Sequence, residues 1–170
     1  MPAFTALPRL LLTLSLAVSL PALAQPGNTS AQPNPRAIVS ENVSLAGFAP
    51  TLKTLKEQLA ADGWNLVAEI NLGERLAKKN VVIPGGLVIL EMTSGGNTVP
   101  LLKNEATRYV AGLMPCSVAV YGMDDGRVII SRMNANLLAG MMEPKVGAVM
   151  QQSAAKLDES ILRALAKSGT

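Results

Sequence analysis

The chain contains no histidine and a single cysteine among its 170 residues. The absence of histidine excludes serine–histidine and cysteine–histidine nucleophile systems, histidine zinc sites and a histidine-ligated haem. The lone cysteine, Cys116, cannot form an internal disulfide, so it is a free thiol or pairs with another molecule. Without a recognisable catalytic constellation, the sequence favours a protein that is not an enzyme.

A strong charge of one sign is also lacking. Fifteen Lys and Arg residues oppose twelve Asp and Glu residues, which gives a net charge of +3. Aromatic residues make up only 3% of the chain, and no basic run is interleaved with them. Nucleic-acid-binding domains usually combine basic patches with stacking or groove-reading side chains. We therefore expect no nucleic acid partner.

No hydrophobic run is long enough to cross a membrane. The most apolar segment, "LLLTLSLAVSL" at residues 10–20, is too short for a spanning helix. Arg9 precedes this run, Pro21 ends it, and small residues follow at 22–24. This pattern predicts a signal peptide at residues 1–24, cleaved after Ala24. We expect a periplasmic or secreted protein with no membrane span after cleavage.

The segment that follows, "QPGNTSAQPNPR" at residues 25–36, is polar and rich in proline, so it predicts a flexible leader. From residue 37 onward, apolar periodicity predicts one domain at 37–170. One face of a half-buried strand is predicted from Trp64, Leu66, Ala68 and Ile70, which alternate with Asn65, Val67 and Glu69 on the other face. Strands are expected at 37–45, 64–70, 86–92, 116–122 and 127–133, and helices at 48–61, 72–80, 99–112, 134–141 and 144–165. This order favours a two-layer α+β sandwich, with a largely antiparallel sheet of about five strands and helices on one face.

Three stretches resemble domain-of-unknown-function family 302: "GWNLVAEINL" from residue 63, "LMPCSVAVY" at 113–121 and "DGRVIISRMNANLL" at 125–138. The resemblance extends over about residues 38–166. It implies a two-layer α+β fold similar in topology to the TATA-box-binding protein, and it brings no established activity. Relatives often have Cys-Asn-Pro or Gly-Asn-Pro where this chain has Gly96-Asn97-Thr98. A mechanism that needs a second cysteine there would therefore fail in this chain.

The leading functional hypothesis is an exported binding or accessory domain. Cys116 shares a strand face with Val118 and Val120, so this face is expected to meet the helices, with the thiol either buried as a small apolar group or at the rim of a pocket. We expect a groove between the sheet and the helices that holds a small molecule or a periplasmic protein and needs no cofactor. The sequence leaves a homodimer open. The candidate ligand-binding residues are Cys116, Glu91, Asn97 and Tyr121.

The alternative hypothesis is a thiol-dependent redox or soft-metal protein. Thiolate and thioether ligands select Cu(I), and the chain offers no histidine to compete with them. A copper site of this kind would combine Cys116 with Met92, Met114 and Met133. Core packing is the ordinary role of methionine and remains the competing interpretation of these residues.

Overall fold

The computed structural model describes residues 35–168. The predicted signal peptide and all but the last two residues of the predicted leader lie outside the described residues. The first described element is a short 3-10 helix, η1 (Pro35–Ile38). The described structure thus begins two residues before the predicted start of the domain.

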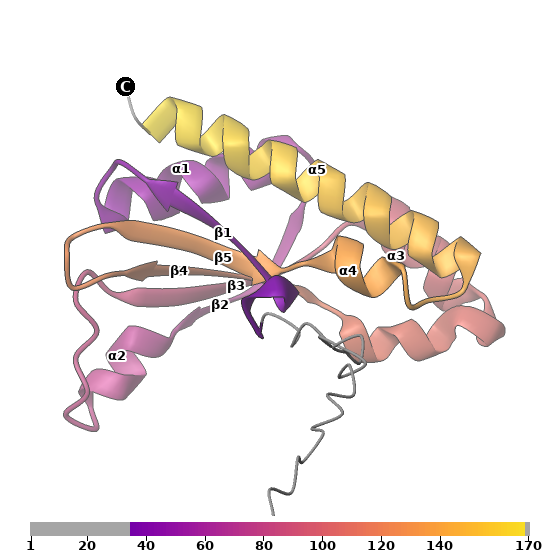
Figure 1. The fold of residues 1–170 in the computed structure, drawn as a ribbon, viewed down its shortest axis with the longest axis horizontal. Helices are drawn as coiled ribbons and strands as arrows, with labels where there is room; N and C mark the ends of the chain where they lie inside the picture. Colours follow the sequence, from indigo (N-terminus) through magenta and orange to yellow (C-terminus); the bar gives the residue numbers. More distant parts are fainter. Residues whose placement is uncertain (1–34, 169–170) are drawn as a thin grey trace, which may run out of the picture. The chain divides into compact units, whose positions relative to one another are not determined.

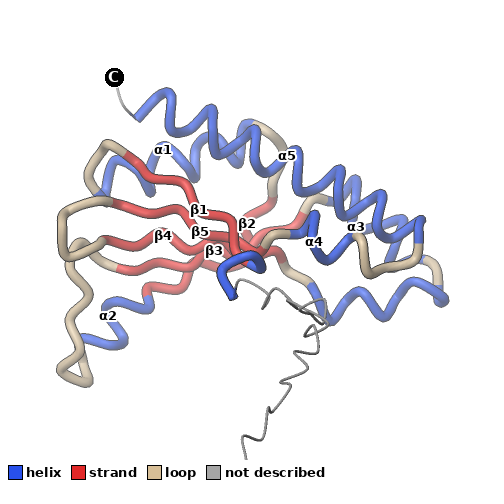
Figure 2. Tube along the Cα trace, viewed as in Figure 1, coloured by secondary structure: helices blue, strands red, loops and turns tan. Residues whose placement is uncertain are grey.

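The domain is built on a five-stranded antiparallel sheet in the order β1-β5-β4-β3-β2 (Figure 1 and Figure 2). The central strands β3 and β4 are rich in valine, isoleucine and leucine, which pack well on a pleated surface. The predicted two-layer α+β sandwich with an antiparallel sheet is confirmed. The strands are β1 (Val39–Ser44), β2 (Asn65–Asn71), β3 (Leu87–Thr93), β4 (Cys116–Gly122) and β5 (Val128–Met133).

Two helices, α1 (Phe48–Ala61) and α5 (Pro144–Ser168), lie side by side over one face of the sheet (Figure 1). Leu55 of α1 and Ile161 of α5 are fully buried against Leu90 and Val118 of the sheet. Burial of each such side chain contributes about 1.5–3 kcal/mol before entropy is counted. The remaining helices are α2 (Leu72–Ala77), α3 (Gly95–Lys103), η2 (Glu105–Leu113) and α4 (Ala135–Ala139).

A second, smaller core lies under the other half of α5. Leu101 of α3, Val110 of η2 and Val146 of α5 are buried together there, with Met114 and Met150 packed against them. Helix α5 therefore spans both cores, and its two halves cover different parts of the domain. The region where the two cores meet forms the candidate site described below.

The predicted alternation of the second strand is wrong beyond Leu66. The register of β2 against β3 shifts between Leu66 and Ala68, as in a β-bulge at Val67. Because one extra residue reverses the side-chain directions that follow, Ala68 and Ile70 point to the face opposite the helices. Glu69 points to the helix side, where it forms an ion pair with Lys56 of α1.

The predicted helix at 99–112 is also different in the structure. Helix α3 begins at Gly95, inside the expected turn, and ends at Lys103; the 3-10 helix η2 then follows. Asn104 separates the two, since its side chain accepts a hydrogen bond from the Ala106 amide. The Thr107 hydroxyl donates to the Leu101 carbonyl at 2.7 Å. Local side-chain bonds of this kind compete with a continuous helix.

Asp62, which ends α1, connects this helix to α5. Burial alone would raise its pKa, but hydrogen bonds from Gln58 and Arg163 lower that pKa to about 2 from 3.8. The resulting stabilisation is present above the unfolded-state pKa and is lost as the pH falls toward 2. Because Arg163 is largely exposed and its ion pairs are screened by solvent, we expect Asp62→Asn to lower the free energy of unfolding by about 1 kcal/mol at pH 7. The difference should vanish near pH 2, as measured by urea unfolding at both values; a constant difference would contradict the assignment.

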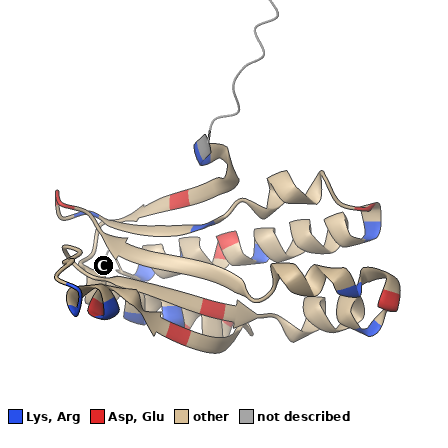
Figure 3. Ribbon diagram, turned by 90° about the horizontal axis from the view of Figure 1, so that it is seen from below, with Lys and Arg blue, Asp and Glu red and all other residues tan. Residues whose placement is uncertain are grey.

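Basic and acidic side chains are interspersed over the helices and strands (Figure 3). Several form pairs of opposite charge, including Lys53 with Glu57 and Arg127 with Asp125. Between residues 35 and 168, no helix combines the length and the apolar character that crossing a membrane requires.

Candidate functional site

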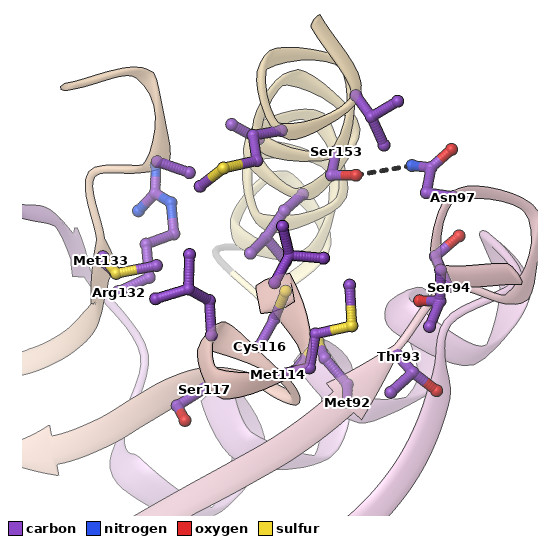
Figure 4. Close-up of a pocket in the computed structure, with 18 of the residues that line it drawn as sticks. Met92, Thr93, Ser94, Asn97, Met114, Cys116, Ser117, Arg132, Met133 and Ser153 are labelled. Atoms are coloured by element: carbon purple, nitrogen blue, oxygen red, sulfur yellow. Dashed lines mark hydrogen bonds between the residues drawn. The ribbon is translucent and has the colours of Figure 1, made fainter. Parts of the chain in front are cut away.

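A pocket of about 100 Å³ lies at one end of the sheet, where β3 and β5 finish and β4 begins. Helix α5 passes over it, and α3 and η2 form one side wall while the β5–α4 connection forms the other. Figure 4 shows the side chains that surround it. The pocket lies between the sheet and the helices, the region where the sequence predicts a groove.

The wall of the pocket is mostly apolar because it is where the two cores meet. Leu157 and Met92 belong to the main core, whereas Leu101 and Val110 belong to the smaller one. Met150, Ala154 and Leu157 of α5 follow one another at helical spacing and line the pocket from above. A mostly apolar wall with few polar groups is typical of a small-molecule site.

Cys116 lies at the start of β4, directly after Pro115, and lines the pocket. The preceding Met114–Pro115 peptide bond is cis. The Cys116 side chain lies on the helix-facing side of β4, together with Val118 and Val120, and it packs against the main core. Burial, reinforced by the negative charge of Glu91, raises the pKa of the Cys116 thiol. The sulfur is therefore protonated at neutral pH, unlike a reactive thiolate.

All four residues of the soft-metal hypothesis line this one pocket: Cys116, Met92, Met114 and Met133. Met92 and Cys116 are direct partners across β3 and β4. In Figure 4 the sulfur atoms of Cys116, Met92 and Met114 point toward the same part of the pocket, while Met133 lies beside Arg132. Met133 is substantially exposed at the end of β5, so it belongs to the rim.

Asn97, predicted as a ligand-binding residue, also lines the pocket. Its side-chain amide donates to the Ser153 hydroxyl at 2.7 Å and so connects α3 to α5 (Figure 4). Because this bond uses one amide N–H, the Asn97 carbonyl oxygen and second N–H keep their hydrogen-bonding capacity. Asn97 can therefore both support the pocket and contact an occupant.

Arg132, near the end of β5, places a guanidinium in the opposite wall. Its side chain is only 9% exposed. Its Nε donates to Asp158 Oδ1 at 2.6 Å, and its Nη1 donates to Asn42 Oδ1 at 2.8 Å. With the contact from Nη2 to Asp158, these bonds use three of the five N–H donors of the group. The ion pair keeps a nearly buried cation neutralised at the pocket wall.

Glu91 and Tyr121, which are also predicted as ligand-binding residues, do not line this pocket. Both side chains lie on the sheet face opposite α1 and α5, because each alternates with a residue of the helix-facing side: Glu91 with Met92, and Tyr121 with Val120. Glu91 accepts a hydrogen bond from the Ser117 hydroxyl at 2.8 Å, and the Tyr121 hydroxyl donates to Glu41 at 2.8 Å. Glu91 therefore acts on Cys116 only through its charge.

Sequence reasoning did not select Arg132, Asp158, Ser153 or Met150 as site residues. The helical period identifies the apolar face of α5 but does not reveal that polar residues on that face contact a pocket. Of these four residues, only Arg132 is indicated by the sequence. It is a charged residue that follows the apolar run "VII" and lies on the same side of the strand as Val128 and Ile130. Such a residue is either at an edge or paired, and here it is paired.

Comparison with known proteins identifies a family and similar solved structures. The sequence profile described as "Domain of unknown function DUF302" matches residues 39–167. A crystal structure of an uncharacterized conserved DUF302 protein from Bacillus stearothermophilus superposes with a TM-score of 0.67 at 22% sequence identity. The match covers 75% of this chain and 98% of that chain. No curated protein matches the sequence. The similarity at this identity extends to the fold.

Proposed function

The chain belongs to the family described as Domain of unknown function DUF302, and we propose that it is a small binding domain whose ligand lies in the pocket between the sheet and α5. The observation that supports this proposal is a mostly apolar pocket where two cores meet, with polar side chains at its walls. The N-terminal sequence supports a location in the periplasm or outside the cell.

The volume of the pocket limits the occupant. A cavity of roughly 150 Å³ accepts the six non-hydrogen atoms of benzene, so about 100 Å³ encloses roughly four. A larger ligand, including a substituted benzene ring, would extend out past Asn97 or Met133. The Arg132 guanidinium has donors beyond those used by Asp158 and Asn42, which favours an occupant with one hydrogen-bond acceptor.

Thiol-based redox chemistry is the weaker proposal for this site. Such chemistry needs a thiolate, but burial and Glu91 raise the pKa of Cys116. It also needs a resolving thiol, and the chain has no second cysteine. The surroundings of Cys116 therefore support a binding role over thiol exchange.

A larger side chain that occupies the pocket should weaken ligand binding. We expect Ala154→Phe, which adds a ring to the part of α5 that lines the pocket, to weaken binding of fluorobenzene at least tenfold. The unsubstituted protein should bind this probe with a Kd near 1 mM, which about 4 kcal/mol of binding energy would supply. Fluorine NMR titration measures both constants.

Ala148→Phe is the matched control, because Ala148 is exposed on the same helix and does not line the pocket. It should change the Kd by less than about twofold, while the unfolding midpoint confirms that both variants fold. Equal binding by the two variants, or no binding by the unsubstituted protein, would contradict the proposal.

A further inference from the structure

Five of the residues that line the pocket carry sulfur: Met92, Met114, Cys116, Met133 and Met150. The whole chain has one cysteine and eight methionines, so much of its sulfur lies around one small volume. The backbone explains part of this concentration. Met92 ends the buried face of β3, Cys116 begins β4 opposite it, and Met114 lies two residues before Cys116.

Three of these sulfur atoms can approach one point. Residues directly opposite in an antiparallel pair have Cα atoms about 4.5–5.5 Å apart, so Met92 and Cys116 have neighbouring side chains on the helix-facing side. Met114 packs against the smaller core and reaches the pocket from the adjoining wall. Figure 4 shows the three sulfur atoms directed toward the same region, with Met133 on the far side.

We propose that the inner end of the pocket binds one Cu(I) ion through the Cys116 thiolate and the thioethers of Met92 and Met114. The inference rests on the proposed function, since it assigns a metal ion to the inner end of the same pocket. On binding, a bond forms between Cu(I) and Cys116 Sγ, and the thiol proton leaves to solvent. No electron is transferred, because the metal arrives and remains as Cu(I).

The donor set selects this metal class. Thiolate and thioether ligands prefer Cu(I), whereas Zn²⁺ sites use histidine or several thiolates and Mg²⁺ or Ca²⁺ sites use oxygen. Across residues 35–168, no three His, Cys, Asp or Glu side chains converge as a hard-metal site would require. The thiolate and the two thioethers are therefore suited to a soft metal ion.

Charge balance favours a monovalent ion in particular. One thiolate and one Cu(I) give a neutral unit, and a neutral unit avoids the large cost of leaving a net charge in an apolar pocket. A divalent ion would leave one uncompensated positive charge there. The other charges near the pocket are Glu91 from β3, and Arg132 and Asp158, which neutralise each other.

The test is an anaerobic titration of the purified protein with Cu(I) in competition with bicinchoninic acid. We expect one ion per chain, and we expect Cys116→Ala, Met92→Leu and Met114→Leu each to weaken binding at least about tenfold, which is the smallest loss usual for a metal-site partner. Met141→Leu is the control, because Met141 is 78% exposed and outside the pocket, and it should not change the affinity.

Fluorescence of Trp64, the only tryptophan, shows whether each variant is folded. If a folded Cys116→Ala variant binds Cu(I) as tightly as the unsubstituted protein, or if the latter fails to compete with the chelator, the inference is overturned. If fluorobenzene still binds and Ala154→Phe prevents it, the pocket remains a ligand site and the metal assignment alone is wrong. If neither probe binds, the proposed function is wrong as well.

Discussion

Gly122→Ala is expected to lower the free energy of unfolding by about 3 kcal/mol or more. Gly122 ends β4, and a Cβ atom there would lie 2.1 Å from the Pro84 carbonyl oxygen and 2.8 Å from the Gly85 Cα. Both are backbone atoms, so no side-chain rotation relieves the overlap. The loop must move, which breaks the bond from the Gly122 amide to the Gly86 carbonyl. Overpacking of this kind costs about 1–3 kcal/mol, and more when backbone must shift.

Urea unfolding followed by the fluorescence of Trp64 measures this loss. The matched control is Gly112→Ala, because a Cβ at Gly112 meets nothing within 4 Å. That substitution should change the free energy of unfolding by less than about 0.5 kcal/mol. Equal unfolding midpoints for the two variants would show that the loop before β3 does not approach the end of β4.

Ile161→Ala is expected to lower the free energy of unfolding by about 3 kcal/mol, within the usual range of about 2–5 for truncation of a large buried side chain. Ile161 is fully buried in α5 and packs in the main core. The substitution removes apolar surface from that core and leaves a cavity that the rigid sheet can fill only in part. Ile161 does not line the pocket under α5, so the proposed binding of fluorobenzene should be retained at low denaturant.

The neighbouring residue provides the control. Leu162 is 57% exposed on the same helix, so Leu162→Ala should cost less than about 1 kcal/mol. The pair differs by one position and therefore tests the orientation of α5 over the sheet. Similar losses from both substitutions would contradict that orientation.

The fold was largely predictable because the periodicity of apolar residues and the turn-forming residues indicate the same elements over most of the chain. The hairpin between β4 and β5 follows from Met123-Asp124-Asp125-Gly126, and Gly126 has the positive φ that such a turn favours. The bulge in β2 was not predictable, because "WNLVAEI" alternates without interruption. The shifted register places Glu69 beside Lys56 of α1, a contact between distant elements that the local sequence does not reveal.

The site was predictable only in part. Cys116 and Asn97 were placed in the groove by their positions at the ends of elements, and both line the pocket. Glu91 was expected beside them, but strand alternation directs it away once Met92 is buried. Arg132, Asp158 and Asn42 come from three distant elements, and only the folded chain brings their charges and dipoles together.

The bulge at Val67 has a consequence for the behaviour of the protein in concentrated solution. Because β2 is an edge of the described sheet, its unpaired backbone groups could template addition of a strand from another chain. The bulge interrupts a regular ladder there, and it places the charged pair of Glu69 and Lys56 along the same edge. The opposite edge, β1, carries Ser40, Glu41 and Asn42. Both edge strands therefore oppose edge-to-edge aggregation.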